Sequence, residues 1–247
     1  MEFTFGIITD GNNKDEFINK IIESIFKQNI PHYEIIIVGQ CHINNNDMIT
    51  IISFDETIKP AWITRKKNII CQQAKYENIV LMHDYIVLHD DWYQGYLKYG
   101  NDFLITSNKI LNGNKTRYID YSLFPHNLSI YLDKCLLPYD IKPDMVLNKF
   151  RFFGGYYYVI KKSLALQYLL DETRSWGQGE DVDLCVRLSN DNILLDFNPL
   201  STVQFLKYKN PVYWVHELSH DEYEHVKTLL LDKNTYRFTI EGIVPKN

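Results

Sequence analysis

The sequence predicts an α/β protein with a mostly parallel central sheet that is flanked by helices. Short runs of apolar, β-prone residues alternate with segments in which apolar residues recur at helical spacing. Several of these runs are nearly continuous, which is typical of strands buried on both faces of a parallel sheet. No repeat or low-complexity linker divides the 247 residues. We therefore expect one domain, residues 1–247.

The first half of the chain shows this alternation most clearly. A β-rich run over residues 3–8 ends at a turn signal, Thr9-Asp10-Gly11, and apolar residues at helical spacing follow from 17 to 26. The other elements expected here are a helix at 62–74 and strands at 33–38, 48–54 and 78–82. In such sheets, ligands bind at the carboxyl ends of the strands. The remaining strand ends that are candidates for binding are Gly39-Gln40, Asp55-Glu56 and His83-Asp84.

The second half is less regular. Residues 101–150 have no clean periodicity, which predicts loops with short strands. An aromatic strand is expected at 152–160, interrupted by Gly154-Gly155, where the backbone can approach a ligand closely. The further expected elements are strands at 193–197 and 202–205 and helices at 163–170 and 222–231.

The most informative segment reads Trp-Gly-Gln-Gly-Glu-Asp-Val-Asp and begins at Trp176. Three carboxylates fall within four positions, at Glu180, Asp181 and Asp183. Apolar residues follow at helical spacing, so the acids occupy the first turn of a helix. A helix N-terminus stabilises negative charge, but capping requires one acid and neither the tryptophan nor the two glycines. The segment therefore indicates a functional site.

Composition argues against several classes of protein. The net charge is −5 and there is no basic tail, so we expect no nucleic-acid partner. The four cysteines form no CxxC pair, so the sequence predicts no zinc site and no disulfide framework. No apolar stretch approaches the roughly 18–20 residues of a transmembrane helix, and no signal peptide is evident. We expect a cytoplasmic protein; its oligomeric state is not predicted.

Several motifs follow one another in a recognisable order. They are Lys66-Lys67-Asn68, a strand ending in His83-Asp84-Tyr85, Gly154-Gly155, and the Trp-Gly-x-Gly-Glu-Asp segment. This order resembles the GT-A fold glycosyltransferases, which have a Rossmann-like sheet, and in particular the inverting family 2 and galactosyltransferase-like enzymes. The resemblance covers nearly the whole chain. It implies a nucleotide-sugar-binding half at 1–100 and an acceptor-binding, catalytic half at 101–247.

The resemblance also implies a reaction. A sugar would move from a nucleotide-diphosphate sugar, with UDP-sugar favoured over GDP-sugar, to a hydroxyl of a glycan or glycoprotein, with inversion. An acceptor hydroxyl is a poor nucleophile and needs a base. By resemblance Asp181 is that base and Glu180 hydrogen-bonds the acceptor, whereas Asp183 is expected to stabilise its helix.

A divalent cation, Mn²⁺ or Mg²⁺, is expected to stabilise charge on the leaving diphosphate. Hard cations take one or two protein carboxylates together with phosphate oxygens and water, and Asp84 is the expected carboxylate. His83 is a second candidate ligand, and by resemblance His216 is a third, with His220 in reserve. The chain departs from the family here, because only the middle position of its triplet is acidic.

Donor binding is assigned to strand ends, to one lysine and to the Gly-Gly pair. A carboxylate at a strand end can accept hydrogen bonds from a base or a ribose. The family usually has Asp-Asp after its second strand, where this chain has Gly39-Gln40, so the base remains open. The candidate donor-binding residues are Thr9, Asp10, Gly11, Asp55, Lys67, Asp84, Gly154 and Gly155.

Two other functions remain as alternatives. A nucleotidyltransferase also uses an α/β sheet and acids, but it needs a glycine-rich, basic loop after the first strand, which residues 9–13 match poorly. A non-catalytic nucleotide- or glycan-binding protein derived from a transferase would explain the altered triplet. The retained Glu180-Asp181 pair argues against it, because a binding protein needs no base.

Overall fold

The computed structural model describes residues 1–11, 14–44, 46–124, 134–210, 215–231, 236–239 and 242–245. The elements in chain order are β1 (Phe3–Ile8), α1 (Asp15–Phe26), β2 (Tyr33–Val38), β3 (Ile49–Ile52), α2 (Ile63–Gln73), β4 (Asn78–His83), β5 (Ile86–Leu88), α3 (Trp92–Tyr99), β6 (Ile105–Leu111), β7 (Ser122–Leu123), β8 (Lys134–Leu136), a 3₁₀ turn (Asn148–Phe150), β9 (Arg151–Phe152), β10 (Tyr157–Lys161), α4 (Lys162–Gln167), α5 (Glu180–Asn190), β11 (Leu195–Phe205), β12 (Val215–Glu217), α6 (His220–Leu231), β13 (Tyr236–Thr239) and β14 (Gly242–Pro245).

The central sheet has the strand order β3-β2-β1-β4-β10-β6-β11-β5. Strands β1 to β4 pair in parallel, and β11 is parallel to β6. Strand β10 is antiparallel to both of its neighbours, and β5 is antiparallel to β11. The expected α/β fold with a flanked, mostly parallel sheet is thus confirmed, with antiparallel pairing confined to the part that contains β10 and β5.

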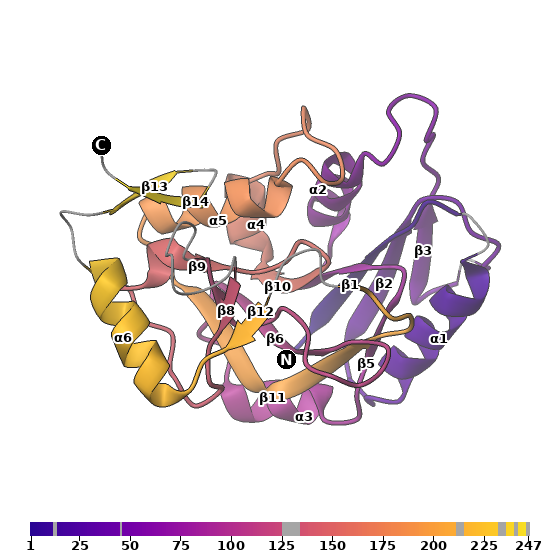
Figure 1. Cartoon of the computed structure of the whole chain (residues 1–247). Coiled ribbons are helices and arrows are strands. Elements are labelled where there is room, and N and C mark those ends of the chain that lie inside the picture. Colours follow the sequence, from indigo (N-terminus) through magenta and orange to yellow (C-terminus); the bar gives the residue numbers. More distant parts are fainter. Residues whose placement is uncertain are drawn as a thin grey trace.

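Helices cover both faces of this sheet (Figure 1). Helices α1 and α3 pack on one face, together with side chains such as Phe5 of β1 and Met82 of β4. Helices α2, α4 and α5 pack on the other face, against side chains such as Ile8 and Leu81. Successive strand residues point to opposite faces. The near-continuous apolar runs follow from this, because every position of β1 and β4 is buried.

Residues 101–150 contain more regular structure than the sequence predicted. Strand β6 lies inside the central sheet and runs for seven residues. Its middle is polar but buried, and Asn108 accepts a hydrogen bond from the Tyr96 hydroxyl at 2.6 Å. Such internally bonded polar residues hide a strand from a hydrophobic pattern.

Two further details differ from the expectations. Helix α3 was not predicted; its Trp92 is buried and donates to the Tyr157 hydroxyl at 2.8 Å. The expected strands at 193–197 and 202–205 are one strand, β11, whose register shifts between Asn198 and Thr202. A smaller sheet, β12-β8-β7-β9, lies beside α6, and β13 pairs with β14 (Figure 1).

Candidate functional site

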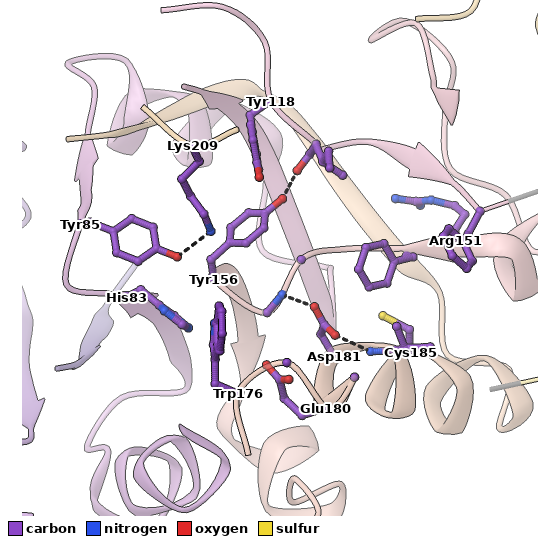
Figure 2. A pocket seen from close by; sticks show the side chains of 18 of the residues that line it. His83, Tyr85, Tyr118, Arg151, Tyr156, Trp176, Glu180, Asp181, Cys185 and Lys209 are labelled. Atoms are coloured by element: carbon purple, nitrogen blue, oxygen red, sulfur yellow. Dashed lines mark hydrogen bonds between the residues drawn. The ribbon is translucent and has the colours of Figure 1, made fainter. Parts of the chain in front are cut away.

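A cavity of about 330 Å³ opens between the end of β4, the Gly154-Gly155 turn, the start of α5 and the segment after β11 (Figure 2). Its walls are largely aromatic, and the Trp176 side chain, 67% exposed, stands at the opening. The polar side chains that line it are His83, Arg151, Glu180, Asp181 and Lys209.

Asp181 is fixed on the wall of this cavity by two backbone groups. Its Oδ2 accepts a hydrogen bond from Gly155 N–H at 2.7 Å, and its Oδ1 accepts one from Val182 N–H at 2.9 Å (Figure 2). Helix α5 begins one residue before it, after Gly177 and Gly179 with φ of +79° and +69°. Glycine adopts this left-handed backbone at little cost, so the two glycines of the motif form the turn that presents Asp181.

Glu180 lies beneath Asp181 and is only 6% exposed. Its Oε1 lies 3.5 Å from Nζ of Lys67, which is 1% exposed and donates to the Gly155 carbonyl at 2.6 Å. Burial raises the pKa of Glu180, the charge of Asp181 adds to this, and Lys67 opposes it. The backbone of Gly155 is therefore held at its N–H by Asp181 and at its carbonyl by Lys67.

The other residues of the Lys66-Lys67-Asn68 motif also bind within the protein. Asn68 exchanges two hydrogen bonds of 2.9 Å with the backbone of Leu170, at the start of the segment that leads to the Trp-Gly turn. Lys66 donates to the Thr9 carbonyl at 2.6 Å and pairs with Glu56. Helix α2 thus connects the turn after β1 to the segment before α5.

Several predicted donor-binding residues meet at the carboxyl edge of β1 and β4. The Thr9 hydroxyl donates to Asp84 Oδ2 at 2.8 Å and accepts from Gly11 N–H at 3.1 Å. Asp10 is exposed on the same turn. Burial raises the pKa of Asp84, against the opposing effects of Thr9 and of Lys14, whose Nζ lies 3.8 Å from Oδ1.

Asp55 and Gly154 occupy different surroundings. Asp55 follows β3 at the same sheet edge, where its Oδ1 accepts from the Thr57 N–H and hydroxyl at 2.9 and 2.6 Å, and it does not line the cavity. Gly154 lines the cavity, and a Cβ built there would lie 2.1 Å from the Tyr156 ring. The close packing of that ring therefore requires glycine at 154.

The structure does not bring the three predicted metal ligands together. Among the described residues, no group of three or more His, Cys, Asp or Glu side chains could hold a metal ion. Asp84 binds Thr9 beside the Lys14 ammonium, and His216, on β12, pairs with Glu222 of α6 at 3.0 Å. Of the three predicted ligands, His83 is the one that lines the cavity. With Thr9 bound to one oxygen of Asp84 and the Lys14 ammonium near the other, these ligands do not fit a divalent cation.

His83 itself has an unusual environment. It is 9% exposed, and its Nε2 has no hydrogen-bond partner within the described structure. Burial lowers the pKa of His83 well below its usual value, and the charges of Lys67 and Lys209 lower it further. The imidazole is therefore neutral at physiological pH, and its unsatisfied Nε2 is buried.

Sequence reasoning missed Lys209, Tyr85 and Tyr118 as cavity residues. Lys209 follows β11 in the run Lys207-Tyr208-Lys209, and a basic pair after a strand was an available signal. Tyr118 lies in the stretch without periodicity, where no signal pointed to it. His220, the reserve ligand, binds Asp140 at 2.9 Å.

Comparison with known proteins supports the fold. No protein-family model and no curated protein matches the sequence. Within the described residues, no helix has the length and apolar character to cross a bilayer. The similar solved structures include three that are distant in sequence. They are GalNAc-T7 with UDP, GalNAc and Mn²⁺ (TM-score 0.59, 12% identity, 84% of this chain and 44% of that chain), Staphylococcus aureus TarS 1–349 (0.52, 12%, 94% and 66%), and TarS 1–349 in complex with UDP (0.51, 11%, 94% and 67%).

These structures resemble this chain over part of their length and at low sequence identity. This chain spans less than half the length of the GalNAc-T7 chain and about two thirds of the TarS fragment. At 11–12% identity, what they share with it is the arrangement of strands and helices. The GT-A fold that the order of motifs predicted is confirmed.

Proposed function

We propose that this chain is a glycosyltransferase that moves a sugar from a nucleotide-diphosphate sugar to a hydroxyl of a glycan or glycoprotein, with inversion. The observation that carries the proposal is the Asp181 carboxylate, held by Gly155 N–H at 2.7 Å on the wall of an aromatic cavity. UDP-sugar is the first choice of donor and GDP-sugar the second. The neighbours solved with UDP support this order.

The chemistry requires one proton transfer and one displacement at the anomeric carbon. The acceptor oxygen bonds to that carbon while the bond from the carbon to the β-phosphate oxygen breaks, and its electron pair stays on the departing diphosphate. The acceptor proton passes to Asp181. Gly155 N–H and Val182 N–H fix the carboxylate in one orientation, which favours proton transfer in a defined direction.

Donor and acceptor would occupy different parts of the molecule. The turn after β1, with Thr9, Asp10 and Gly11, and Asp55 after β3 form the edge for the nucleotide, in the half 1–100. Acceptor sugars would stack on the aromatic wall, which includes Tyr156 and the exposed Trp176. Residues 101–247 then supply the acceptor site and the base, with the diphosphate near their junction at the end of β4.

The Mn²⁺ or Mg²⁺ that the resemblance implies has no fitting donor set among the described residues. Asp84 is bound by Thr9 and neighbours an ammonium group, which repels a second cation. We therefore assign no step of the transfer to a divalent ion.

A ligand panel tests the proposed function. Thermal unfolding is measured with UDP, GDP, CDP and ADP, with the corresponding sugar nucleotides, and with added EDTA or MnCl₂. A ligand at 100 times its dissociation constant stabilises the native state by about 2.7 kcal/mol. For a chain of this size, that raises the melting temperature by roughly 5–10 °C.

We expect uridine nucleotides to stabilise the protein more than adenine nucleotides do. An equal response to all nucleotides, or no response to any, contradicts the proposal. Stabilisation by UDP without any release of UDP from UDP-sugars favours the non-catalytic binding protein instead.

A further inference from the structure

Two lysines beside the cavity differ from the three nearby lysines that lie close to carboxylates. Lys66 and Lys67 are buried and engage Glu56 and Glu180, and Lys14 lies near Asp84. Lys207 and Lys209, after β11, form none of the ion pairs found among the described residues, and both ammonium groups lie near the Tyr85 ring, 4.8 and 5.0 Å from its centroid. The site therefore holds positive charge that the described carboxylates do not neutralise.

Lys209 is held firmly in place. The Asn112 side chain receives a hydrogen bond from its backbone N–H and donates one to its carbonyl, both at 2.8 Å. Its ammonium donates to the Tyr85 hydroxyl at 3.1 Å and lies within 5.2–6.0 Å of the ring centroids of Tyr156, Phe205 and Tyr118. Figure 2 shows the side chain pointing between the tyrosines into the cavity. A cation surrounded by aromatic rings is ordered before any ligand arrives.

The position of Lys209 coincides with the junction of the two halves. Residues 83–85 connect the nucleotide edge to the cavity, because Asp84 binds Thr9 while His83 and Tyr85 line the cavity wall. A donor with its nucleotide at the strand ends and its sugar before Asp181 must pass its diphosphate along these residues. Lys209 and His83 both line the cavity along that path, and the buried Nε2 of His83 has no hydrogen-bond partner among the described residues.

Given the proposed transferase function, on which this inference rests, we propose that Lys209, with His83 and with Lys207 at the rim, binds the donor diphosphate directly and takes the place of a divalent cation. The Lys209 ammonium forms charge-assisted hydrogen bonds to phosphate oxygens, and the neutral imidazole donates one N–H. As the bond to the sugar breaks, the electron pair left on the β-phosphate oxygen is stabilised by this fixed charge.

The surroundings of Lys209 agree with a role in binding an anion. Burial and the neighbouring charge of Lys207 lower the pKa of Lys209, so a diphosphate would relieve both effects.

Calorimetric titration with UDP and with uridine tests the proposal. Each is measured in EDTA and in MnCl₂ on the wild type, Lys209→Met, Lys209→Arg and Lys227→Met. Lys227 is the matched control, because it is also half-buried and lies over an aromatic ring, that of Tyr223 at 5.6 Å on α6, away from the cavity.

We expect the wild type to bind UDP in EDTA about as tightly as in MnCl₂. Lys209→Met should weaken UDP binding by about 10- to 100-fold, the loss of a charged hydrogen bond, and leave uridine binding unchanged. Lys209→Arg should restore much of the affinity, and Lys227→Met should match the wild type. Circular dichroism checks that each variant folds.

The possible failures are distinguishable. UDP binding that is lost in EDTA and returns with MnCl₂ overturns this inference and leaves the transferase function standing. Unchanged UDP affinity in Lys209→Met also overturns it. If no nucleotide binds under either condition, the proposed function fails as well.

Discussion

The two basic segments of this protein contrast sharply. The run on α2 contains Lys66 and Lys67. The sequence made Lys67 a candidate donor-binding residue, yet both lysines are buried and engage carboxylates and backbone carbonyls. The pair after β11, Lys207 and Lys209, drew no attention in the sequence, yet it lies beside the cavity without a carboxylate partner among the described residues. The difference shows that a lysine beside the site is available to bind an anion only when no carboxylate of the protein already neutralises its charge.

The contrast has an energetic side. A buried ammonium that pairs with a buried carboxylate is costly to remove, since its partner is left desolvated and unpaired. An ammonium without such a partner contributes little to stability and retains its charge for a ligand. The same substitution should therefore change stability much more in the first segment than in the second.

Lys67→Met should have the largest effect on stability. It leaves Glu180 buried beside Asp181 and removes the donor to the Gly155 carbonyl, so we expect a loss of about 3–5 kcal/mol in the free energy of unfolding. Urea unfolding measures it. The double variant Lys67→Met, Glu180→Gln removes both charges and should be more stable than Lys67→Met alone. A change below about 0.5 kcal/mol in the single variant would contradict the structural role of Lys67.

Gly155→Ala should have an intermediate effect. The added Cβ lies 2.5 Å from Glu180 Oε1, and Glu180 is packed against Lys67 and cannot retreat freely. We expect a loss of about 1–3 kcal/mol, as for other overpacked sites, measured by the same urea titration. Gly100→Ala serves as a steric control, because a Cβ there meets no atom within 4 Å; its φ of +100° adds backbone strain but no clash. An unchanged midpoint in Gly155→Ala would mean that Glu180 moves easily.

Lys209→Met should change stability least. The substitution loses ring contacts of the ammonium but places a thioether among the same rings, so we expect the free energy of unfolding to stay within about 0.5 kcal/mol of the wild type or to rise. A loss comparable to that of Lys67→Met would show that Lys209 is structural, and the contrast between the two segments would fail.

The same variant makes a prediction about pH. The pKa of Lys209 is lowered in the folded state, so below the unfolded value of 10.5 the unfolded chain binds more protons and stability rises with pH. The titratable groups near Lys209 are Lys207, His83 and three tyrosines, Tyr85, Tyr118 and Tyr156; burial lowers the pKa of His83 and raises those of the tyrosines. As the pH rises toward the unfolded pKa of 10.5, the wild type should gain stability relative to Lys209→Met. A constant difference would contradict this.

Sequence could predict the parts of the fold that follow a simple pattern. Strands β1 and β2 match the expected ranges because both of their faces are largely apolar. Strand β6 was missed because its buried residues include Asn108, whose polar side chain is bonded internally. A hydrophobic pattern carries no information about such bonds.

The candidate site likewise contains residues that the sequence could predict and residues that it could not. Asp181 could be predicted because the turn, the acids and the helix that position it are contiguous in sequence. Lys209 could not, since its environment is assembled from Tyr85, Tyr118 and Tyr156, which lie far apart along the chain. Contacts of that kind become visible only in the fold.

The central claim is that Asp181 is the base of a sugar transfer, and Asp181→Asn tests it most directly. Asparagine can still accept the Gly155 N–H through its carbonyl oxygen but no longer takes a proton. Turnover is followed as UDP release from the sugar nucleotide selected by the ligand panel, and donor affinity is measured by calorimetry. Asp183→Asn is the matched control, because Asp183 pairs with Arg187 outside the cavity.

The expected result is a fall in turnover of about 10²- to 10⁴-fold with donor affinity nearly unchanged, and a control that retains its turnover. Near-normal turnover in Asp181→Asn would contradict the account.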